Sequence, residues 1–157
     1  CILISTDKAV YPSSAYGASK LSAEWVWKWA GKIQDKTRFV IFRSGNFKQS
    51  AGNVLEVWDR QNKAGEPLTI TDPDMERYFI DTRKAAEIVA GIPEWAKGGD
   101  IVIPKMRLQK IIDLMHEQFP KCSYRITGIR SGEKKTERLM TDDEKIAYEN
   151  EEVQVIT

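Results

Sequence analysis

A tyrosine and a lysine near the start of the chain have a spacing that suits proton transfer. Tyr16 and Lys20 fall in a segment, 15–32, whose apolar spacing predicts a helix, so their Cβ atoms share one face about 5–6 Å apart. A cation beside a phenol favours the ionised form of the phenol. Such a phenol can take the proton of a sugar or alcohol hydroxyl while a hydride leaves the same carbon. Because this spacing also occurs on many ordinary helices, the pair alone does not indicate a catalytic site, and the residues around it must be considered.

The residues before this helix place further polar groups at the end of a predicted strand. Segment 1–5 is apolar and is typical of a buried parallel strand, and Thr6, Asp7 and Lys8 follow Ser5 directly. In open α/β sheets, ligands bind at the carboxyl ends of the strands. Asp7 and Lys8 are therefore either a solvated loop ion pair of little energetic value or an acid–base pair directed at the same substrate as Tyr16.

The elements that must position these groups alternate between strands and helices, which indicates an α/β fold. Further strands are expected over 38–42, 68–70, 100–103, 123–126 and 153–156, the last at a sheet edge. Further helices are expected over 54–63, 81–89 and 108–119, with a short one from 132 to 140. Segment 44–52 is predicted to be a loop.

The first helix carries an unusual number of aromatic residues. Leu21, Trp25 and Trp29 form its apolar stripe, and Trp27 points away from that stripe. Gly31 indicates that the helix ends nearby. Because a helix with aromatic residues on two sides must bury both, we expect Trp27 or its neighbours either at a contact with a second copy or in packing within the chain.

Composition narrows the classes of function. The chain has 157 residues, with 24 Lys and Arg against 23 Asp and Glu, and this near balance argues against nucleic acid as a partner. The longest apolar runs are four residues, so we expect no membrane span and no secretory leader. The two cysteines lack metal-ligand spacing, which predicts free thiols, a reducing cytoplasmic location and no metal site. Since the chain begins without Met and within a strand, we expect it to be a piece of a longer protein.

Five motifs in a fixed order resemble one known group of enzymes. They are Ser5–Ala9 with Tyr16-x-x-x-Lys20, then Arg43–Asn46, Pro67–Phe79, Ile103–Met106 and Gly128–Lys134. Together they resemble the extended short-chain dehydrogenase/reductase superfamily, and within it the UDP-N-acetylglucosamine 4,6-dehydratases of the polysaccharide-biosynthesis group. The resemblance implies a Rossmann-like, doubly wound parallel sheet. Residues 1–50 would carry its last strands and catalytic helix, and 51–157 mainly a UDP-sugar-binding region with some segments returning to the Rossmann domain.

The resemblance also implies a reaction and roles in it. NADP (or NAD) would oxidise C4 of the UDP-sugar, with Tyr16 as the base and Lys20 holding cofactor and phenolate, while Thr6 bonds the oxygen at C4. Asp7 and Lys8 would eliminate the 6-hydroxyl as acid and base, in an order that stays open, and hydride would return to C6. A tyrosine at position 16 is typical of the branch that inverts C5 and feeds capsular or related sugars.

Further contacts follow from the same resemblance. Ser5 and Arg43 would join Tyr16 and Lys20 at the cofactor. The sugar nucleotide would be bound by Asn46, Thr69, Arg77, Arg130 and Glu133. An arginine fork suits a diphosphate because it donates two hydrogen bonds at once. The alternative role for any single arginine, and above all for Arg43, is an ordinary surface charge. The alternative role for Glu133 is a favourable carboxylate in the first turn of a helix. The single histidine, His116, is expected to be structural.

The glycine-rich dinucleotide fingerprint is missing from the sequence. We therefore expect this chain to be the back half of the enzyme, with the cofactor bound mainly by an absent N-terminal half and the isolated chain inactive. Two alternatives stay open. One is a nucleotide-sugar 4-epimerase or reductase of the same superfamily, against which the Asp7–Lys8 pair argues. The other is a non-catalytic, truncated UDP-sugar-binding partner subunit. A homo-oligomer through the helix Tyr16–Lys32 is expected in the enzyme.

Overall fold

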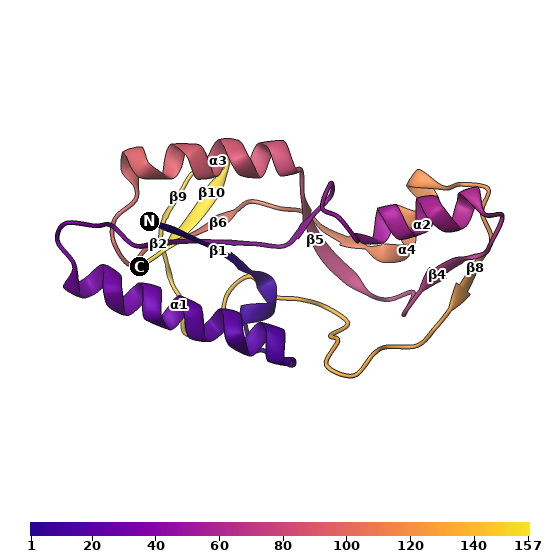
Figure 1. The fold of residues 1–157 in the computed structure, drawn as a ribbon, viewed down its shortest axis with the longest axis horizontal. Coiled ribbons are helices and arrows are strands. Elements are labelled where there is room, and N and C mark those ends of the chain that lie inside the picture. Colours follow the sequence, from indigo (N-terminus) through magenta and orange to yellow (C-terminus); the bar gives the residue numbers. More distant parts are fainter.

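The computed structural model describes all residues 1–157 and divides into a larger body and a smaller lobe (Figure 1). The larger body holds a five-stranded sheet in the order β1-β2-β6-β10-β9. These strands are Ile2–Thr6, Val40–Ser44, Ile101–Pro104, Val153–Ile156 and Ile146–Glu149. Helix α1 (Ala15–Ile33) covers one face of the sheet and α3 (Thr82–Trp95) covers the other (Figure 1). The expected α/β class and Rossmann-like layering are confirmed.

Alternation along the central strands builds a core on each face of the sheet. Val40 and Phe42 of β2 pack in the cluster beneath α3, whereas Ile41 belongs to the cluster on the α1 side. Neighbouring residues of a strand point to opposite faces, so a strand covered on both sides must be apolar throughout. Strand β2 runs from Val40 to Ser44, two residues later than the expected 38–42, and it is buried along its whole length, including the polar Arg43 and Ser44. Strand β1 pairs only with β2 and forms one edge of the sheet.

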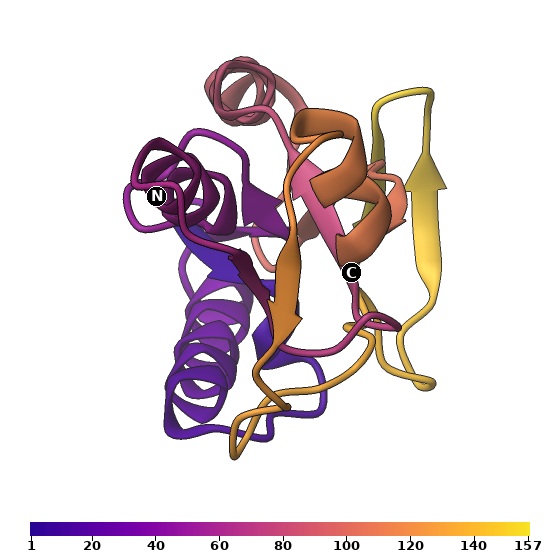
Figure 2. The same cartoon turned by 90° about the vertical axis from the view of Figure 1, so that its right-hand side faces the viewer.

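The smaller lobe is built from short strands and two helices. Strands β3 (Asn46–Phe47), β5 (Glu76–Ile80) and β7 (Leu108–Lys110) form one sheet, and β4 (Leu68–Ile70) pairs with β8 (Tyr124–Ile126). Helices α2 (Val54–Lys63) and α4 (Ile111–Gln118) complete the lobe, and Figure 2 shows α4 and β8 in front. Its core surrounds the buried Trp58, whose Nε1 donates to the Thr69 carbonyl at 2.8 Å.

Several strands and helices differ from those expected from the sequence, because they depend on strand pairing with residues distant in the chain. Strand β10 is not an edge strand, since it lies between β6 and β9 and runs antiparallel to both. The helix expected from 108 begins only at Ile111, because 108–110 pairs with β5. No helix forms over 132–140, where the Lys135 carbonyl instead accepts from the Glu76 amide at 2.8 Å. Strands β3, β5 and β9 were not predicted, and α3 extends past residue 89 to Trp95.

Helix α1 presents a different face from the one that its apolar stripe predicts. Trp25 and Trp29 are 65% and 62% exposed, so packing within this chain does not bury them. Trp27 instead packs on the α1-side core and stacks edge-on against Phe39 at 5.8 Å. Gly31 does not end the helix. A Cβ at this position would lie 2.3 Å from the Gly99 amide nitrogen, so Gly31 permits close backbone packing.

No helix of the chain is both long and apolar enough to cross a membrane.

Candidate active site at the end of strand β1

The carboxyl end of β1 leads directly into the catalytic candidates. The strand ends at Thr6, and Asp7–Ala9 form a single 3-10 turn whose N-cap is the Thr6 hydroxyl. Ser14 then caps α1, its Oγ accepting from the Gly17 amide at 3.2 Å. Gly17 lets the first turn of α1 approach the 3-10 turn closely, since a Cβ there would lie 2.3 Å from the Lys8 carbonyl oxygen. The local sequence thus places Tyr16 and Lys20 beside Asp7 and Lys8, as predicted.

Tyr16 and Lys20 both lie at this strand end, but they do not bond to each other. The Tyr16 side chain is more than half exposed, so its hydroxyl is free to meet a ligand. Lys20 Nζ donates to the Ile4 carbonyl of β1 at 3.0 Å. This bond anchors the lysine to the strand and leaves two of its three N–H groups for other acceptors.

Asp7 and Lys8 form an ion pair that is mostly buried. Asp7 is 0% exposed and its Oδ1 accepts from Lys8 Nζ at 2.9 Å and from the Thr6 hydroxyl at 2.9 Å. The interpretation as a solvated loop pair is therefore wrong for Asp7, although Lys8 remains partly exposed. The pair is held at the strand end, with Lys8 as its exposed member.

Two residues that sequence reasoning did not select complete this cluster. Glu137 is 4% exposed, with its Oε1 3.8 Å from Lys8 Nζ and its Oε2 3.3 Å from Lys134 Nζ. Lys134 Nζ also donates to the Val10 carbonyl at 2.7 Å. Four alternating charges thus meet beside β1. Glu137 lies in a segment expected to be a short helix, and nothing in its spacing marked it as a functional residue, whereas Lys134 ends one of the resembling motifs.

Arg43 lies in a buried network on the α1 side of the sheet. It is 2% exposed, so the alternative of a surface charge is wrong. Its five N–H groups donate to Glu24, Glu144 and the Leu139 carbonyl at 2.6–3.0 Å. Ser5 Oγ also donates to Glu24 Oε1 at 2.6 Å. The predicted cofactor contacts of Ser5 and Arg43 would require bonds of this network to break.

The network also sets the charge states of its members. Burial alone would lower the pKa of Arg43, but its hydrogen bonds to Glu24 and Glu144 outweigh burial and raise the pKa. Burial alone would raise the pKa of Glu144, but its hydrogen bonds from Arg43 and the Thr141 amide lower it overall. Arg43 is therefore a permanent cation that joins α1, β2 and the segment 139–144.

Three of the expected substrate residues lie together in the connection between lobe and body. Arg77 donates to the carbonyls of Glu76, Lys134 and Lys135 at 2.7–2.9 Å, and lies 3.6 Å from Glu133. The Arg130 amide donates to Glu133 Oε2 at 3.2 Å, and the Arg130 side chain is exposed. Arg77 thus holds the 133–135 segment in place with most of its donors, and Arg130 is the arginine with a free fork.

The other expected residues contact residues of the smaller lobe. Asn46 Nδ2 donates to the Tyr78 carbonyl at 3.2 Å, and Thr69 bonds Gln61 in the small lobe. His116 stacks edge-on against Tyr124 on the surface of that lobe. The structure brings Arg77, Arg130 and Glu133 toward the strand-end residues through one segment, but it does not bring Thr69 there.

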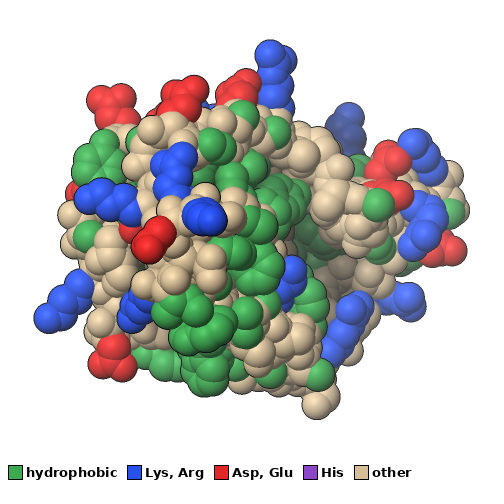
Figure 3. All heavy atoms as spheres, turned by 60° about the vertical axis from the view of Figure 1, so that its left-hand side comes forward, with side chains coloured by type: hydrophobic (Ala, Val, Ile, Leu, Met, Phe, Trp, Pro, Cys, Tyr) green, Lys and Arg blue, Asp and Glu red, His purple; other side chains and the backbone are tan.

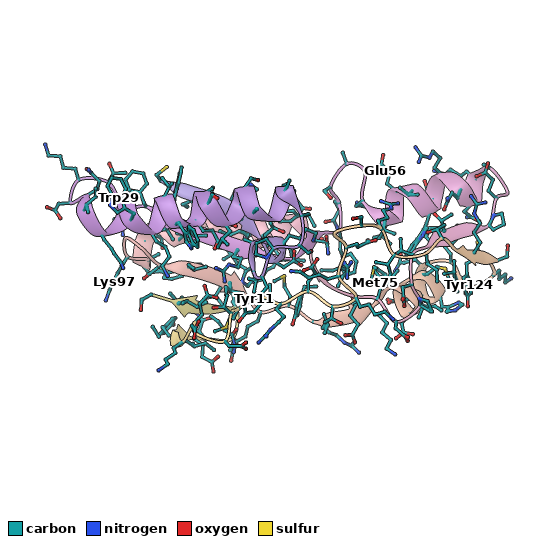
Figure 4. The ribbon with its side chains drawn as sticks, turned by 90° about the horizontal axis from the view of Figure 1, so that it is seen from below. Tyr11, Trp29, Glu56, Met75, Lys97 and Tyr124 are labelled. Atoms are coloured by element: carbon teal, nitrogen blue, oxygen red, sulfur yellow. The ribbon has the colours of Figure 1, made fainter.

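A hollow separates the larger body from the smaller lobe in the space-filling view (Figure 3). In Figure 4, Tyr11 lies on the larger body, whereas Met75 lies on the side of the lobe. Tyr11 adopts a left-handed backbone, with φ of 46°, and its hydroxyl exchanges hydrogen bonds with Asp142 at 2.8 and 2.9 Å. The loop after the Asp7–Lys8 turn is thereby fastened to the segment that follows Glu137.

The sequence of the chain matches the model of one protein family. The family model described as polysaccharide biosynthesis protein matches residues 1–157. The chain belongs to this family. The inverting UDP-N-acetylglucosamine 4,6-dehydratase of Campylobacter jejuni is 38% identical over 100% of this chain, which covers 48% of that relative. The resemblance seen in the motifs is therefore confirmed.

Solved structures related to this polysaccharide biosynthesis family member give the same fold. Pen from Bacillus thuringiensis matches 99% of this chain and 52% of that one, with a TM-score of 0.91 and 29% identity. The dTDP-glucose 4,6-dehydratase DesIV from Streptomyces venezuelae, solved with NAD bound, matches 88% of this chain and 50% of that one, with a TM-score of 0.78 and 18% identity. The chain spans about half the length of the curated relatives that it matches.

Proposed function

We propose that this chain is the part of a nucleotide-sugar 4,6-dehydratase that carries its proton-transfer residues, acting on UDP-N-acetylglucosamine with inversion at C5. One observation carries the proposal: the mostly buried Asp7–Lys8 pair lies at the end of β1 beside the exposed phenol of Tyr16. Oxidation and reduction at C4 alone would need Tyr16 but no second acid–base pair. Elimination of water across C5 and C6 needs both an acid and a base. The identity to the Campylobacter dehydratase supports the same reaction.

The residues at the strand end suit one part of a nicotinamide cofactor. The exposed Tyr16 hydroxyl and the free donors of Lys20 fit the ribose hydroxyls next to the ring, and DesIV was solved with NAD bound. The sequence holds no glycine-rich turn that could bind the pyrophosphate. We propose that NADP, or NAD, is bound mainly by residues outside this chain and supplies hydride acceptance at C4 and hydride return at C6.

The proposed roles of the chain's own residues follow from their positions. Tyr16, as phenolate, takes the proton of the sugar 4-hydroxyl, and Thr6 bonds the same oxygen. The resulting 4-ketone acidifies the C5 proton. One member of the Asp7–Lys8 pair removes this proton, and the other protonates the departing 6-hydroxyl, which leaves as water. A lysine acts as a base only when neutral and as an acid only when charged, so the order of the two roles depends on the charge state of Lys8.

The uridine diphosphate is proposed to lie along the segment 130–135. Arg130 has the free fork that suits a diphosphate, and Glu133 can accept from ribose hydroxyls. Arg77 positions this segment, and Asn46 and Thr69 would extend the site into the small lobe. In this proposal, 1–50 belongs to the cofactor domain and 51–157 mainly to the substrate region, with α3, β6, β9 and β10 completing the cofactor sheet.

The experiment that tests the function is product analysis with the protein of the longest reading frame that contains this chain. We expect a UDP-4-keto-6-deoxy sugar from UDP-N-acetylglucosamine, with solvent deuterium incorporated at C5. A 4-epimer without deoxygenation would indicate an epimerase, and binding without turnover would indicate a partner subunit. Replacing Tyr16 by Phe should lower turnover by about 10²–10⁴-fold with little change in UDP-sugar affinity. More than half of normal turnover in this variant would contradict the role of Tyr16.

We also propose that the enzyme is a cytoplasmic homo-oligomer in which α1 faces a second copy. Trp25, Val26, Trp29 and Ile33 leave one side of this helix apolar and exposed. Replacing Trp25 and Trp29 by Lys should lower the mass measured by analytical ultracentrifugation. An unchanged mass would show that this face packs against another part of the same protein.

A further inference from the structure

Glu137 differs from the other buried glutamate of the larger body in how its oxygens are used. Glu24 accepts from Ser5 and Arg43, so both of its oxygens have hydrogen bonds. Glu137 is equally inaccessible, yet its Oε2 has no hydrogen-bond partner and meets Lys134 only as an ion pair at 3.3 Å. A buried, unpaired carboxylate oxygen costs free energy, so a purely structural role accounts poorly for Glu137.

A second unpaired oxygen lies in the same cluster. Asp7 Oδ2 is also buried without a partner, while Asp7 Oδ1 binds Lys8. Lys8 Nζ therefore lies between two buried carboxylates, at 2.9 Å from Asp7 and 3.8 Å from Glu137. The groups facing Lys8 are these two acids, with Lys134 behind Glu137, whereas α1 packs on the Lys8 backbone through Gly17. The two free oxygens mark a site with capacity for a ligand or a moving proton.

The segment that carries Glu137 is also the one proposed to bind the nucleotide. Arg77 donates to the carbonyls of Lys134 and Lys135, and Thr136 Oγ1 donates to Glu76. Arg130 and Glu133 precede Glu137 by seven and four residues. The proposed nucleotide contacts and Glu137 therefore lie on one short segment that these hydrogen bonds fasten at its middle.

We propose that Glu137 is a positioning residue of the elimination step: its carboxylate holds Lys8 Nζ beside Asp7. This proposal rests on the proposed function, because it assigns Lys8 to elimination. Lys8 exchanges one proton in each turnover and then returns to its starting state, whether it acts as acid or as base, and Glu137 provides a fixed counter-charge that does not itself contact the reacting carbon. This role of Glu137 involves no oxidation or reduction, because it concerns only the proton on Lys8.

The test compares Glu137→Gln, Glu137→Asp and the control Asp143→Asn in the protein of the longest reading frame. Asp143 is an exposed carboxylate of the same segment without an ion pair. In Glu137→Gln, reduction of the bound cofactor at 340 nm should persist, while release of the 4-keto-6-deoxy product should fall by about 10²-fold, the loss typical of a misplaced group. Glu137→Asp should recover part of this loss, and Asp143→Asn should match the wild type.

The balance of the two half-reactions separates positioning from folding. A carboxylate 3.8 Å from Lys8 Nζ that only positions this amine should affect elimination and leave oxidation in place. Equal loss of oxidation and elimination in Glu137→Gln, or no recovery in Glu137→Asp, would overturn the proposal.

A second measurement does not depend on the reaction. Lysines are dimethylated with ¹³C-formaldehyde, and the Lys8 signal is identified by its loss in Lys8→Arg. The chemical shift of this signal should differ between Glu137→Gln and wild type and should be unchanged in Asp143→Asn. If this difference is seen without dehydratase product, the proposed function fails while the Glu137–Lys8 coupling stands. If the difference is absent, the coupling fails whatever the product.

Discussion

Removing the guanidinium of Arg43 should destabilise the fold strongly. The side chain is 2% exposed and makes five hydrogen bonds that join Glu24 of α1, Glu144 and the Leu139 carbonyl. In Arg43→Met, Glu144 can turn toward solvent because its side chain is 15% exposed, but Glu24 cannot. The cost is therefore that of one uncompensated buried carboxylate, about 3–5 kcal/mol. This is a third or more of the stability of many domains, about 5–15 kcal/mol.

The assay is urea unfolding followed by tryptophan fluorescence, with two further variants as references. Arg83→Met removes an arginine from the exposed pair with Glu87 and should cost less than about 1 kcal/mol. Arg43→Met combined with Glu24→Leu removes both charges and should recover most of the loss, since well-packed apolar residues replace buried ion pairs at little cost. A loss below about 1 kcal/mol in Arg43→Met, or no recovery in the double variant, would refute the reasoning that an unpaired Glu24 dominates.

Three further outcomes are expected. Lys8→Ala should leave cofactor reduction through Tyr16 intact and release little 4-keto-6-deoxy product, measured by absorbance at 340 nm and chromatography; equal loss of both steps would mean that Lys8 only holds the site together. The 157-residue chain alone should bind NADP too weakly for calorimetric titration and form no product, and micromolar binding would contradict this. The hydrogen bonds from Arg43 and Thr141 lower the pKa of Glu144 in the folded protein. The Glu144 carboxylate therefore contributes its full stabilisation above the unfolded pKa of about 4.3, and this stabilisation is lost as the pH falls through the lower folded pKa. A Glu144→Gln variant should lose less stability on acidification, measured as urea midpoints between pH 6 and 3.

The structure of the first part of the chain could be predicted from sequence because it depends on local interactions. The apolar run of β1, the polar turn after it and the caps of α1 depend on neighbours a few residues away, so the relative placement of Asp7, Lys8, Tyr16 and Lys20 could be predicted. The same holds for α2, which spans 54–63 as expected, and for β2, whose apolar residues require cover on both faces.

Tertiary structure alone decided which side of α1 is buried. The most apolar stripe of the helix faces outward, and the side with Glu24 faces the sheet because Arg43 supplies a buried counter-charge 19 residues away. Pairing across long separations likewise placed β10 inside the sheet and replaced the expected helix over 132–140 by an irregular segment bonded to β5. That segment brings Glu137 to Lys8 across 129 residues of chain, a contact that no local pattern of residues can encode.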